Sequence, residues 1–313
     1  MKPSITVVGS VNMDLVFRTP RMPAIGETLQ GREFHQIPGG KGANQAVAAA
    51  RQGAQVQFIG AVGADGFGEF SRHCLAAEGI DLTHLTTVDG IATGVAGILV
   101  ADDGNNSIVI AAGANATLSV TQVEHGRAAI SAANLLICQL ETPLPSVTRA
   151  IEIAHAAGVP VILNPAPAQA LNGALLKQVD YLILNETEAT QLSGVAVCSA
   201  ESAAAAAQAL LQMGAGCVIL TMGGDGTVLS ELNGTRFLAA ITVDVVDTTA
   251  AGDTFVGAFA VGLASGLTVF DACTQAQYAA ALTVTQLGAQ TSIPQQQAVV
   301  EFMTQRSKLL SSI

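Results

Sequence analysis

The chain alternates short apolar runs with longer alanine-rich stretches. The apolar runs have the length of strands and contain few polar residues, at positions 5–8, 55–59, 135–140, 159–164, 181–184 and 217–221. The alanine-rich stretches have the length of helices, at positions 40–52, 67–78, 121–133, 145–157, 168–178 and 202–213. Apolar strands that alternate with helices are typical of a parallel sheet covered on both faces. We therefore predict an α/β fold with helices on both faces of a central, mostly parallel sheet.

Two segments depart from this alternation. Residues 14–37 have little helical periodicity, and residues 93–112 predict two strands around a turn-rich link. Because ligands bind at the carboxyl edge of open α/β sheets, a small β lid over that edge would fit both segments. A solvent-facing hairpin is the alternative. We predict one domain over residues 1–313, with lid segments at approximately 12–40 and 93–112 inserted in it.

Composition limits the classes of partner. The net charge of −11 argues against a nucleic-acid-binding surface, so an anionic ligand would be held by local amides, a lysine or a metal. Mean hydropathy is +0.47, but the apolar excess is mostly alanine and no continuous membrane span is expected. The apolar run after the first residues is too short for a signal peptide, and the five cysteines form no C-x-x-C pair. We expect a cytoplasmic protein.

Several familiar catalytic motifs are missing from the sequence. The glycines around Lys41 do not form a P-loop, and the protein-kinase signature set is absent. The five histidines have no spacing typical of zinc ligands, and no G-x-S-x-G is present. A nicotinamide oxidoreductase is disfavoured because the chain lacks G-x-G-x-x-G.

The stretch "DTTAAGDTF", residues 247–255, places small residues before a predicted helix start. Their unobstructed amides, together with the positive end of the helix dipole, predict an anion hole at residues 250–253. Asp253 in such a hole could accept a proton from a hydroxyl that attacks the bound anion. Phosphoryl transfer needs these parts. The alternative is that Asp253 only caps the helix.

A second cluster, "PGGKGANQAVAAA", begins at Pro38. Three glycines in four residues let the backbone approach a ligand closely, and Lys41 and Asn44 add a cation and an amide at a helix start. This suits a polyhydroxylated or phosphorylated ligand. A flexible turn with Asn44 facing solvent is the alternative.

Polar residues also follow the predicted strands. They are Asn12, Asp14, Glu141, Asn164, Asn185, Glu188 and Thr221. Any one of them is as well explained as a loop or helix cap. The carboxyl ends of parallel strands converge on one crevice, so together these residues predict a polar site suited to an array of diols.

Two of these stretches resemble the signatures of a known family. "GGKGANQAVAAARQG" from Gly39 and "DTTAAGDTFVGAF" from Asp247 resemble the two signatures of the ribokinase-like (PfkB) carbohydrate kinases. The likeness runs through nearly the whole chain, in "GSVNMD", "GANATLS", "QLETP", "NPAPA", "NETEA", "TMGGDG" and "GAQTSIP". It implies a three-layer fold with a β lid, and ATP-dependent phosphorylation of D-ribose at the 5-hydroxyl.

The resemblance also implies roles for individual residues. Asp253 would be the general base and would also contact sugar and nucleotide, and the amides of Ala250, Ala251, Gly252 and Asp253 would hold the transferring phosphoryl group. The pentose would be bound by Asn12, Asp14, Gly40, Lys41, Gly42, Asn44 and Glu141. ATP, accompanied by Mg²⁺, would contact Asn185, Thr221, Met222, Gly223, Gly224, Asp225, Gly226 and Gly252. A monovalent cation, K⁺, would be surrounded by Asp247, Thr249, Thr283, Gln286, Gly288 and Ser292. The lid would close over the sugar and build a homodimer.

Two positions depart from the family pattern, and other functions stay open. Gln277 stands where these kinases often place a histidine near the adenine, and Thr249 occupies a variable position of the cation site. A kinase for 2-deoxyribose, another sugar or a nucleoside is the first alternative. A non-catalytic sugar-binding protein is the second, although the intact Asp253 argues against it.

Overall fold

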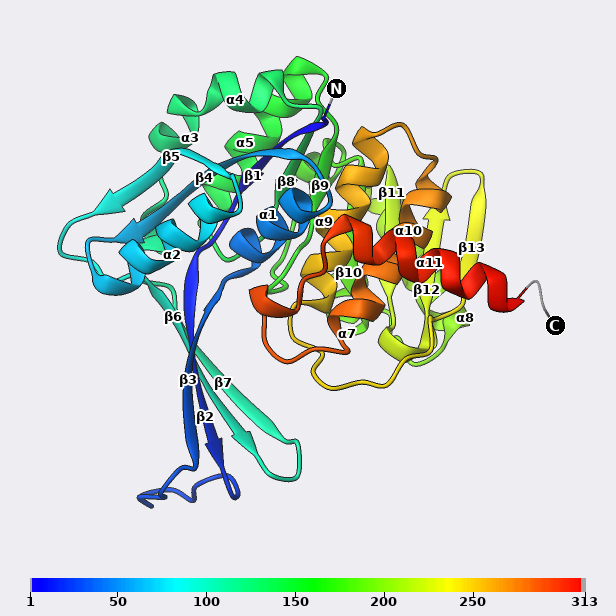
Figure 1. Cartoon of the computed structure of the whole chain (residues 1–313). Coiled ribbons are helices and arrows are strands. Elements are labelled where there is room, and N and C mark those ends of the chain that lie inside the picture. The colour runs from blue at the N-terminus through cyan, green and yellow to red at the C-terminus, as the bar shows by residue number, and fades with distance from the viewer. Residues whose placement is uncertain (1, 311–313) are drawn as a thin grey trace.

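A computed structural model describes residues 2–310, and its main feature is a nine-stranded sheet (Figure 1). The strand order is β13-β12-β11-β10-β9-β8-β1-β4-β5. Strands from β11 to β5 in this order pair in parallel, while β12 and β13 are antiparallel additions. The strands are β1 (Ser4–Val8), β4 (Gln55–Gly63), β5 (Asp81–Val88), β8 (Leu135–Cys138), β9 (Val161–Leu163), β10 (Tyr181–Asn185), β11 (Cys217–Thr221), β12 (Thr227–Glu231) and β13 (Gly234–Leu238).

Helices cover both faces of this sheet, and each face has its own apolar core. One face carries α1 (Lys41–Arg51), α2 (Gly66–Ala77), α9 (Ala251–Ala264), α10 (Val269–Thr283) and α11 (Gln296–Leu310). The other face carries α3 (Val120–His125), α4 (Arg127–Ala132), α5 (Leu144–Ala157), α6 (Gly173–Leu176), α7 (Glu186–Ser193) and α8 (Ala200–Met213). The predicted α/β fold, with a mostly parallel sheet between two helical layers, is confirmed.

A separate four-stranded sheet projects from the body as a lid (Figure 1). Its strands are β2 (Asn12–Thr19), β3 (Glu33–Gly39), β6 (Gly94–Ala101) and β7 (Asn106–Ala111), in the order β3-β2-β6-β7. The two segments without helical periodicity therefore form the β lid that the sequence predicts. The division of the chain into one domain over 1–313 stays a prediction.

Two helix predictions were wrong in extent. Residues 168–178 form only the single turn Gly173–Leu176, and the side chain of Asn172 accepts the N–H of Leu175 and so caps a helix that begins at residue 173. Residues 121–133 form two short helices, which meet at Gly126. A Cβ at Gly126 would lie 2.4 Å from the Cδ1 of Ile59, so this break lets the chain pass close to β4.

Three strands of the main sheet were missed. Strand β5 is an edge strand whose side chains are mostly exposed or half-buried, so it lacks a continuous apolar run. Strands β12 and β13 form an antiparallel hairpin around Leu232 and Asn233. The pair Asn233-Gly234 is a common hairpin signal and could have predicted this turn.

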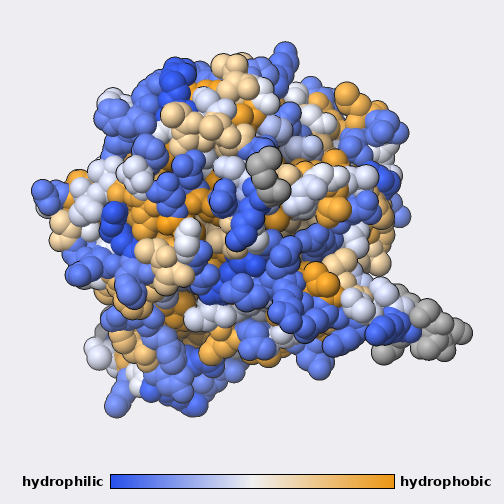
Figure 2. Space-filling model, turned by 45° about the horizontal axis from the view of Figure 1, so that its top comes forward, coloured by the Kyte–Doolittle hydropathy of each residue, from blue (hydrophilic) through white to orange (hydrophobic). Residues whose placement is uncertain are grey.

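The surface of the body is mixed in character. On the face drawn in Figure 2, apolar residues are interspersed with hydrophilic ones. None of the helices within residues 2–310 is long and apolar enough to cross a membrane.

Candidate active site

The sheet topology places a crevice beside β1. Strand order runs from β1 to β4 and β5 on one side, and to β8 and β9 on the other. Such a switch point opens a crevice at the carboxyl ends of the strands. There the Oγ of Ser10 donates to Glu141 Oε2 (2.5 Å), and the same oxygen accepts the N–H of Lys41 (3.0 Å). Glu141 thereby ties the ends of β1 and β8 to the first residue of α1.

The glycines around Lys41 let the chain approach itself. A Cβ at Gly40 would lie 2.6 Å from the amide nitrogen of Asn12, and one at Gly42 would lie 2.5 Å from that of Ser10. Gly40 also has a φ of 91°, which favours glycine. The predicted close approach therefore occurs, but at these two positions the space is filled by residues 9–12, which follow β1, rather than left for a ligand.

Asp253 lies in the first turn of α9 and is 7% exposed. Ala250, the residue that caps this helix, has a φ of 60° and is the one non-glycine residue with positive φ in the described range 2–310. Such strain is characteristic of functional turns. The N–H of Thr254 makes the first helical bond, to the carbonyl of Ala250 (2.8 Å), and that of Ala251 faces Thr248 (3.3 Å). The amides of Gly252 and Asp253 thus precede the helical ladder and are available to an anion.

Both oxygens of the Asp253 carboxylate accept side-chain amides from α1. Asn44 Nδ2 donates to Oδ2 (2.9 Å), and Gln45 Nε2 donates to Oδ1 (2.9 Å). Asn44 is 5% exposed, and its Oδ1 has no hydrogen-bond partner among the described residues. A buried, unpartnered acceptor next to a carboxylate is suited to a hydroxyl donor from a ligand.

The lid contributes two further polar side chains to the crevice. Asn12 is 3% exposed, and its Oδ1 accepts from Asn115 Nδ2 (2.8 Å). Asp14, 9% exposed, packs its carboxylate where Gly39 lacks a side chain, since a Cβ there would lie 2.3 Å from Oδ2. The half-buried Lys41 lies near three carboxylates. Burial alone would lower the pKa of Lys41, but the charges of Asp253, Glu141 and Glu188 raise it.

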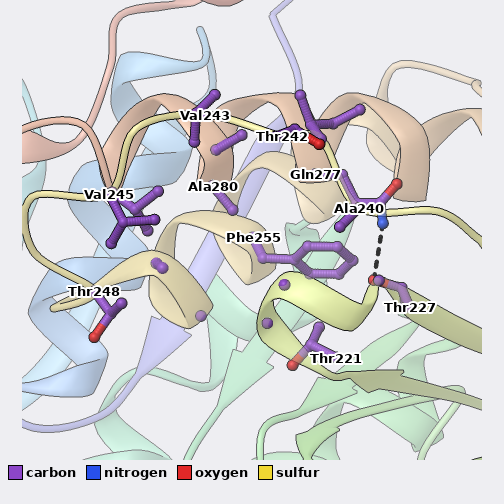
Figure 3. Close-up of a pocket in the computed structure, with 18 residues that line it drawn as sticks. Thr221, Thr227, Ala240, Thr242, Val243, Val245, Thr248, Phe255, Gln277 and Ala280 are labelled. Atoms are coloured by element: carbon purple, nitrogen blue, oxygen red, sulfur yellow. Dashed lines mark hydrogen bonds between the residues drawn. The ribbon is translucent and has the colours of Figure 1, made fainter. Parts of the chain in front are cut away.

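Two adjoining cavities open in front of α9. The smaller, of about 200 Å³, is lined mainly by polar residues including Lys41, Asn185 and Asp253. The larger, of about 350 Å³, is mostly apolar. In Figure 3 the ring of Phe255 points into it, between Thr221 and Thr227 on one side and the loop with Thr242 and Val243 on the other. Both cavities are lined by Thr221, Thr248 and Gly252, so one elongated ligand could occupy both.

The residues named for a cation lie behind the anion hole. Asp247 Oδ1 accepts the N–H (2.9 Å) and hydroxyl (2.7 Å) of Thr249, and Oδ2 accepts the N–H of Gly288 (2.9 Å). Burial would raise the pKa of Asp247, but these hydrogen bonds bring it below its ordinary value. The carboxylate therefore stays charged and joins the two loops, and such oxygen-rich loops are suited to hard cations.

The other three cation-site residues can contribute only in part. The Thr283 hydroxyl is fully buried and lies 3.0 Å from both the Ala279 carbonyl and the Thr254 hydroxyl. The Ser292 hydroxyl donates to Ala289 (2.8 Å), and Gln286 is exposed. The backbone carbonyls of these residues could ligate an ion, and a hydroxyl that donates its proton still has oxygen lone pairs to offer.

Comparison with known families decides the class of this site. A family model described as pfkB family carbohydrate kinase matches residues 2–296. The chain belongs to the pfkB family of carbohydrate kinases. The resemblance seen in the two glycine-rich signatures is thereby confirmed, and with it the prediction that the chain is a kinase.

Individual relatives agree with this assignment. A ribokinase of Haemophilus influenzae is 45% identical over 303 residues, covering 97% of this chain and 99% of that protein. A deoxyribokinase of Salmonella typhi is 36% identical over 301 residues, covering 96% and 98%. The structure of Arabidopsis thaliana ribokinase complexed with ribose and ATP matches with a TM-score of 0.89 at 32% identity, covering 96% and 99%.

The residues predicted to contact the nucleotide fall into two groups in this kinase. Those that line a cavity are Asn185, Thr221, Gly223, Gly224, Gly226 and Gly252. Asn185 is also the cap of α7, where it exchanges hydrogen bonds with Glu188 (2.9 and 3.0 Å). Met222 is buried in the core and Asp225 is exposed, and neither lines either cavity. Their predicted contacts have no support from side-chain placement.

Gln277 lines the larger cavity of this kinase from α10. Its Nε2 lies 3.1 Å from the Thr227 hydroxyl (Figure 3) and 3.4 Å from the Leu238 carbonyl. The side-chain amide is therefore held by β12 and by the end of β13, at the apolar end of the cavity. How Gln277 contacts the adenine of a nucleotide stays a prediction.

Sequence reasoning missed several polar residues of the site. Ser10, Gln45, Asn115 and Gln139 are buried and bonded to predicted site residues or to each other. Gln45 carried a usable signal, since two adjacent amides in an alanine-rich helix are unusual in a core. The loop that lines the larger cavity, residues 240–245, carries no sequence signal that could have identified it.

Asp14 gives the apoenzyme a pH-dependent stability. Burial, followed by the charges of Glu141 and Asp253, raises the pKa of Asp14 from 3.8 to about 7. The folded chain thus holds this proton more tightly than the unfolded chain, and the stability gained below about pH 4 is lost as the pH rises through 7. In ligand-free thermal unfolding, the free energy of unfolding of Asp14→Asn relative to that of the wild type should therefore rise between pH 5 and 8, by on the order of 2 kcal/mol. A difference that does not change with pH would contradict this account.

Proposed function

We propose that this kinase transfers the γ-phosphoryl group of ATP to the 5-hydroxyl of D-ribose. The observation that carries the proposal is the placement of Asp253. Its carboxylate is fixed by Asn44 and Gln45, next to free amides at the start of α9. The buried Asp14 lies near enough to Asp253 to feel its charge, and the apolar cavity in front of Phe255 adjoins the polar cavity that Asp253 lines. A general base next to a polar site, with an apolar cavity of the size of a nucleobase adjoining it, fits phosphoryl transfer from a nucleotide to a sugar.

The sugar side offers groups that match vicinal hydroxyls. Asn12 and Asp14 come from the lid, and Asn44 and Glu141 come from the body. The unpartnered Oδ1 of Asn44 and the carboxylates of Asp14 and Glu141 would accept sugar hydroxyls, while Lys41 would donate. The same contacts would bring the lid against the sugar and exclude water from the crevice.

The reaction would then need one proton transfer and one displacement. Asp253 would take the proton of the 5-hydroxyl as the sugar oxygen forms its bond to the γ-phosphorus. The bond from that phosphorus to the bridging oxygen would break, and ADP would leave with the electron pair. The amides of Gly252 and Asp253 would stabilise the charge on the transferring group.

Mg²⁺ would accompany the nucleotide. Within residues 2–310 no group of three or more His, Cys, Asp or Glu side chains could hold a metal ion. Mg²⁺ commonly binds substrate phosphates with few protein ligands, so the side chains present fit an ion that is held mainly by the phosphates of ATP.

K⁺ activation is expected from the loops joined by Asp247. This carboxylate connects Thr249, next to the anion hole, with Gly288, so a cation held there would order residues 250–253. We expect K⁺ to raise turnover several-fold over a bulky organic cation, and Asp247→Ala to abolish that response. Turnover is measured with Mg²⁺ and ATP saturating in both buffers. Equal rates of the wild type in the two buffers would remove the cation from the account.

A homodimer through the lid is also part of the proposal. Strand β7 lies at one edge of the lid sheet, and it exposes Ile108, Val109 and Ile110. Phe17 and Phe34 add an exposed aromatic pair, with ring centroids 4.8 Å apart. Such an apolar sheet is suited to contact with a second copy. Sedimentation equilibrium of the wild type distinguishes the dimer from a monomer.

A kinase for 2-deoxyribose is the second candidate, because a deoxyribokinase is among the relatives. The experiment that separates the two is ADP release with ATP, Mg²⁺ and K⁺ against ribose, 2-deoxyribose, fructose and nucleosides. We expect the highest kcat/KM on ribose. A higher value on 2-deoxyribose would move the assignment to that sugar, and sugar binding without turnover on the whole panel would support a non-catalytic protein.

A further inference from the structure

We propose that Gln45 is a positioning residue that fixes the carboxylate of Asp253, and that Gln139 orients Gln45 for this task. The inference rests on the proposed role of Asp253 as the general base. Gln45 lies on α1, one residue beyond Asn44, and its side chain is fully buried. Its amide is the point at which α1, α9 and the ends of two central strands meet.

Three hydrogen bonds use the whole side-chain amide of Gln45. Its Nε2 donates to Asp253 Oδ1 (2.9 Å) and to Asn164 Oδ1 (3.0 Å), and its Oε1 accepts from Gln139 Nε2 (2.6 Å). All of these partners belong to the protein. Since Gln45 is 0% exposed, a substrate cannot reach it, and its effect on the reaction must pass through Asp253.

The orientation of the Gln45 amide is set from two independent sides. An ionised carboxylate only accepts hydrogen bonds, so Asp253 requires a donor in front of it. Asn164 uses its own Nδ2 on the carbonyl of Ile183 (2.9 Å) and therefore presents Oδ1 to Gln45. Both constraints place Nε2 on the same side, which leaves Oε1 for Gln139.

Gln139 follows β8 and is held by packing, because its Oε1 has no hydrogen-bond partner among the described residues. It is 0% exposed, and its Oε1 lies where Gly9 lacks a side chain, since a Cβ at Gly9 would lie 2.1 Å from this atom. Gly9 follows β1, so the relay begins in the central strands of the sheet. The sheet thereby sets the rotation of the carboxylate through Gln139 and Gln45, independently of the sugar.

Two consequences for catalysis follow from this arrangement. The amides of Asn44 and Gln45 occupy one acceptor position on each carboxylate oxygen, so the remaining positions are fixed toward the crevice. Hydrogen bonds to the charged form also favour ionisation of a buried carboxylate. The charged groups that face this site are Asp14 of β2 and Lys41 of α1, with Glu141 and Glu188 beyond Lys41.

The test replaces the amide by an apolar side chain of similar length. Gln45→Met should lower kcat by about 10- to 100-fold, while the KM for the sugar changes by less than about threefold, because a base works only when it is aligned in the transition state. The acid side of the kcat–pH profile should move to higher pH, because one donor to the charged form is lost. Gln139→Met should shift both quantities in the same direction by less, and the double variant should fall short of additivity.

Gln52→Met is the matched control. Gln52, the residue that caps the C-terminus of α1, is also fully buried, and its Nε2 donates to the carbonyl of Pro294 (3.0 Å) rather than to Asp253. With K⁺ saturating, Gln52→Met should lower the unfolding temperature without moving the pH midpoint. A Gln45→Met enzyme with kcat within about twofold of wild type and an unchanged midpoint would overturn the inference, as would equal effects of the Gln45 and Gln52 variants.

All variants are compared on the sugar that the wild type phosphorylates best. A wrong sugar assignment would then overturn the proposed substrate and leave this comparison intact. A wild type without turnover on any sugar would overturn both. If Gln45→Met fails to fold, Gln139→Met decides alone, because it keeps every direct contact of Asp253. An unmoved midpoint in Gln139→Met would then overturn the relay.

Discussion

Asp253→Asn lowers kcat by about 10²–10⁴, the usual worth of a positioned general base. The fold should survive because the two neighbouring amides can adapt to the new side chain. The Nε2 of Gln45 must keep pointing toward position 253, because Oε1 accepts from Gln139, and it would donate to the new Oδ1 there. The Oδ1 of Asn44 has no partner in the described chain, so this amide can rotate and accept the new Nδ2. The substitution therefore removes the base without leaving two donors in conflict.

Calorimetry and steady-state kinetics together test this prediction. The variant should bind ATP with an affinity within a few-fold of wild type and should keep its unfolding temperature. Sugar affinity should change modestly, because the rotated Asn44 no longer offers its acceptor. If kcat of Asp253→Asn stays within a few-fold of wild type, Asp253 is not the base.

Gly257→Ala destabilises the protein by about 1–3 kcal/mol, the usual cost of overpacking a tight core. Gly257 lies one turn after Asp253 on α9, where that helix crosses α1. A Cβ there would lie 2.4 Å from Ala48 Cβ and 2.8 Å from both the amide nitrogen of Ala49 and the carbonyl oxygen of Gln45. The two backbones can yield only by separating. Separation would lengthen the contacts of Asp253 with α1, so kcat should fall as well, by about tenfold or more.

Gly66→Ala is the control for helix propensity. Alanine is better than glycine in a helix interior by about 1 kcal/mol, so an unobstructed site at a helix start should lose no stability. Gly66 is the first residue of α2, and a Cβ there would have nothing within 4 Å. Chemical denaturation of both variants should show a loss for Gly257→Ala and no loss for Gly66→Ala. A Gly257→Ala variant that is as stable as wild type would contradict the close packing of α1 on α9.

The parts of the fold that the sequence predicts are those with a local cause. Buried parallel strands read as continuous apolar runs, so β1, β8, β10 and β11 could be found. Strand β5 could not, because an exposed edge strand has no such run. The site followed the same rule. Asp253 stood out because small residues precede it at a helix start, and Asp14 and Glu141 because they follow predicted strands.

The rest of the site depends on contacts between distant segments. Gln45 and Asp253 are 208 residues apart, and Gln139 is 94 residues from Gln45. No local pattern states that these side chains meet, since the meeting is set by the crossing of α1 and α9 over the carboxyl ends of β1 and β8. The apolar cavity has the same origin, because it is lined by Phe255 of α9, Ala280 of α10 and the loop at residues 240–245.

The product of the reaction tests the central claim most directly. The wild type is incubated with ATP, Mg²⁺, K⁺ and ribose, and in parallel with 5-deoxyribose, and the products are followed by ³¹P NMR. The account predicts a new phosphate ester whose phosphorus couples to the two protons of C5, formed with ADP from ribose. It predicts no ester from 5-deoxyribose, which should bind and inhibit. A phosphate ester on a secondary carbon, or ester formation from 5-deoxyribose, would contradict the placement of the 5-hydroxyl at Asp253.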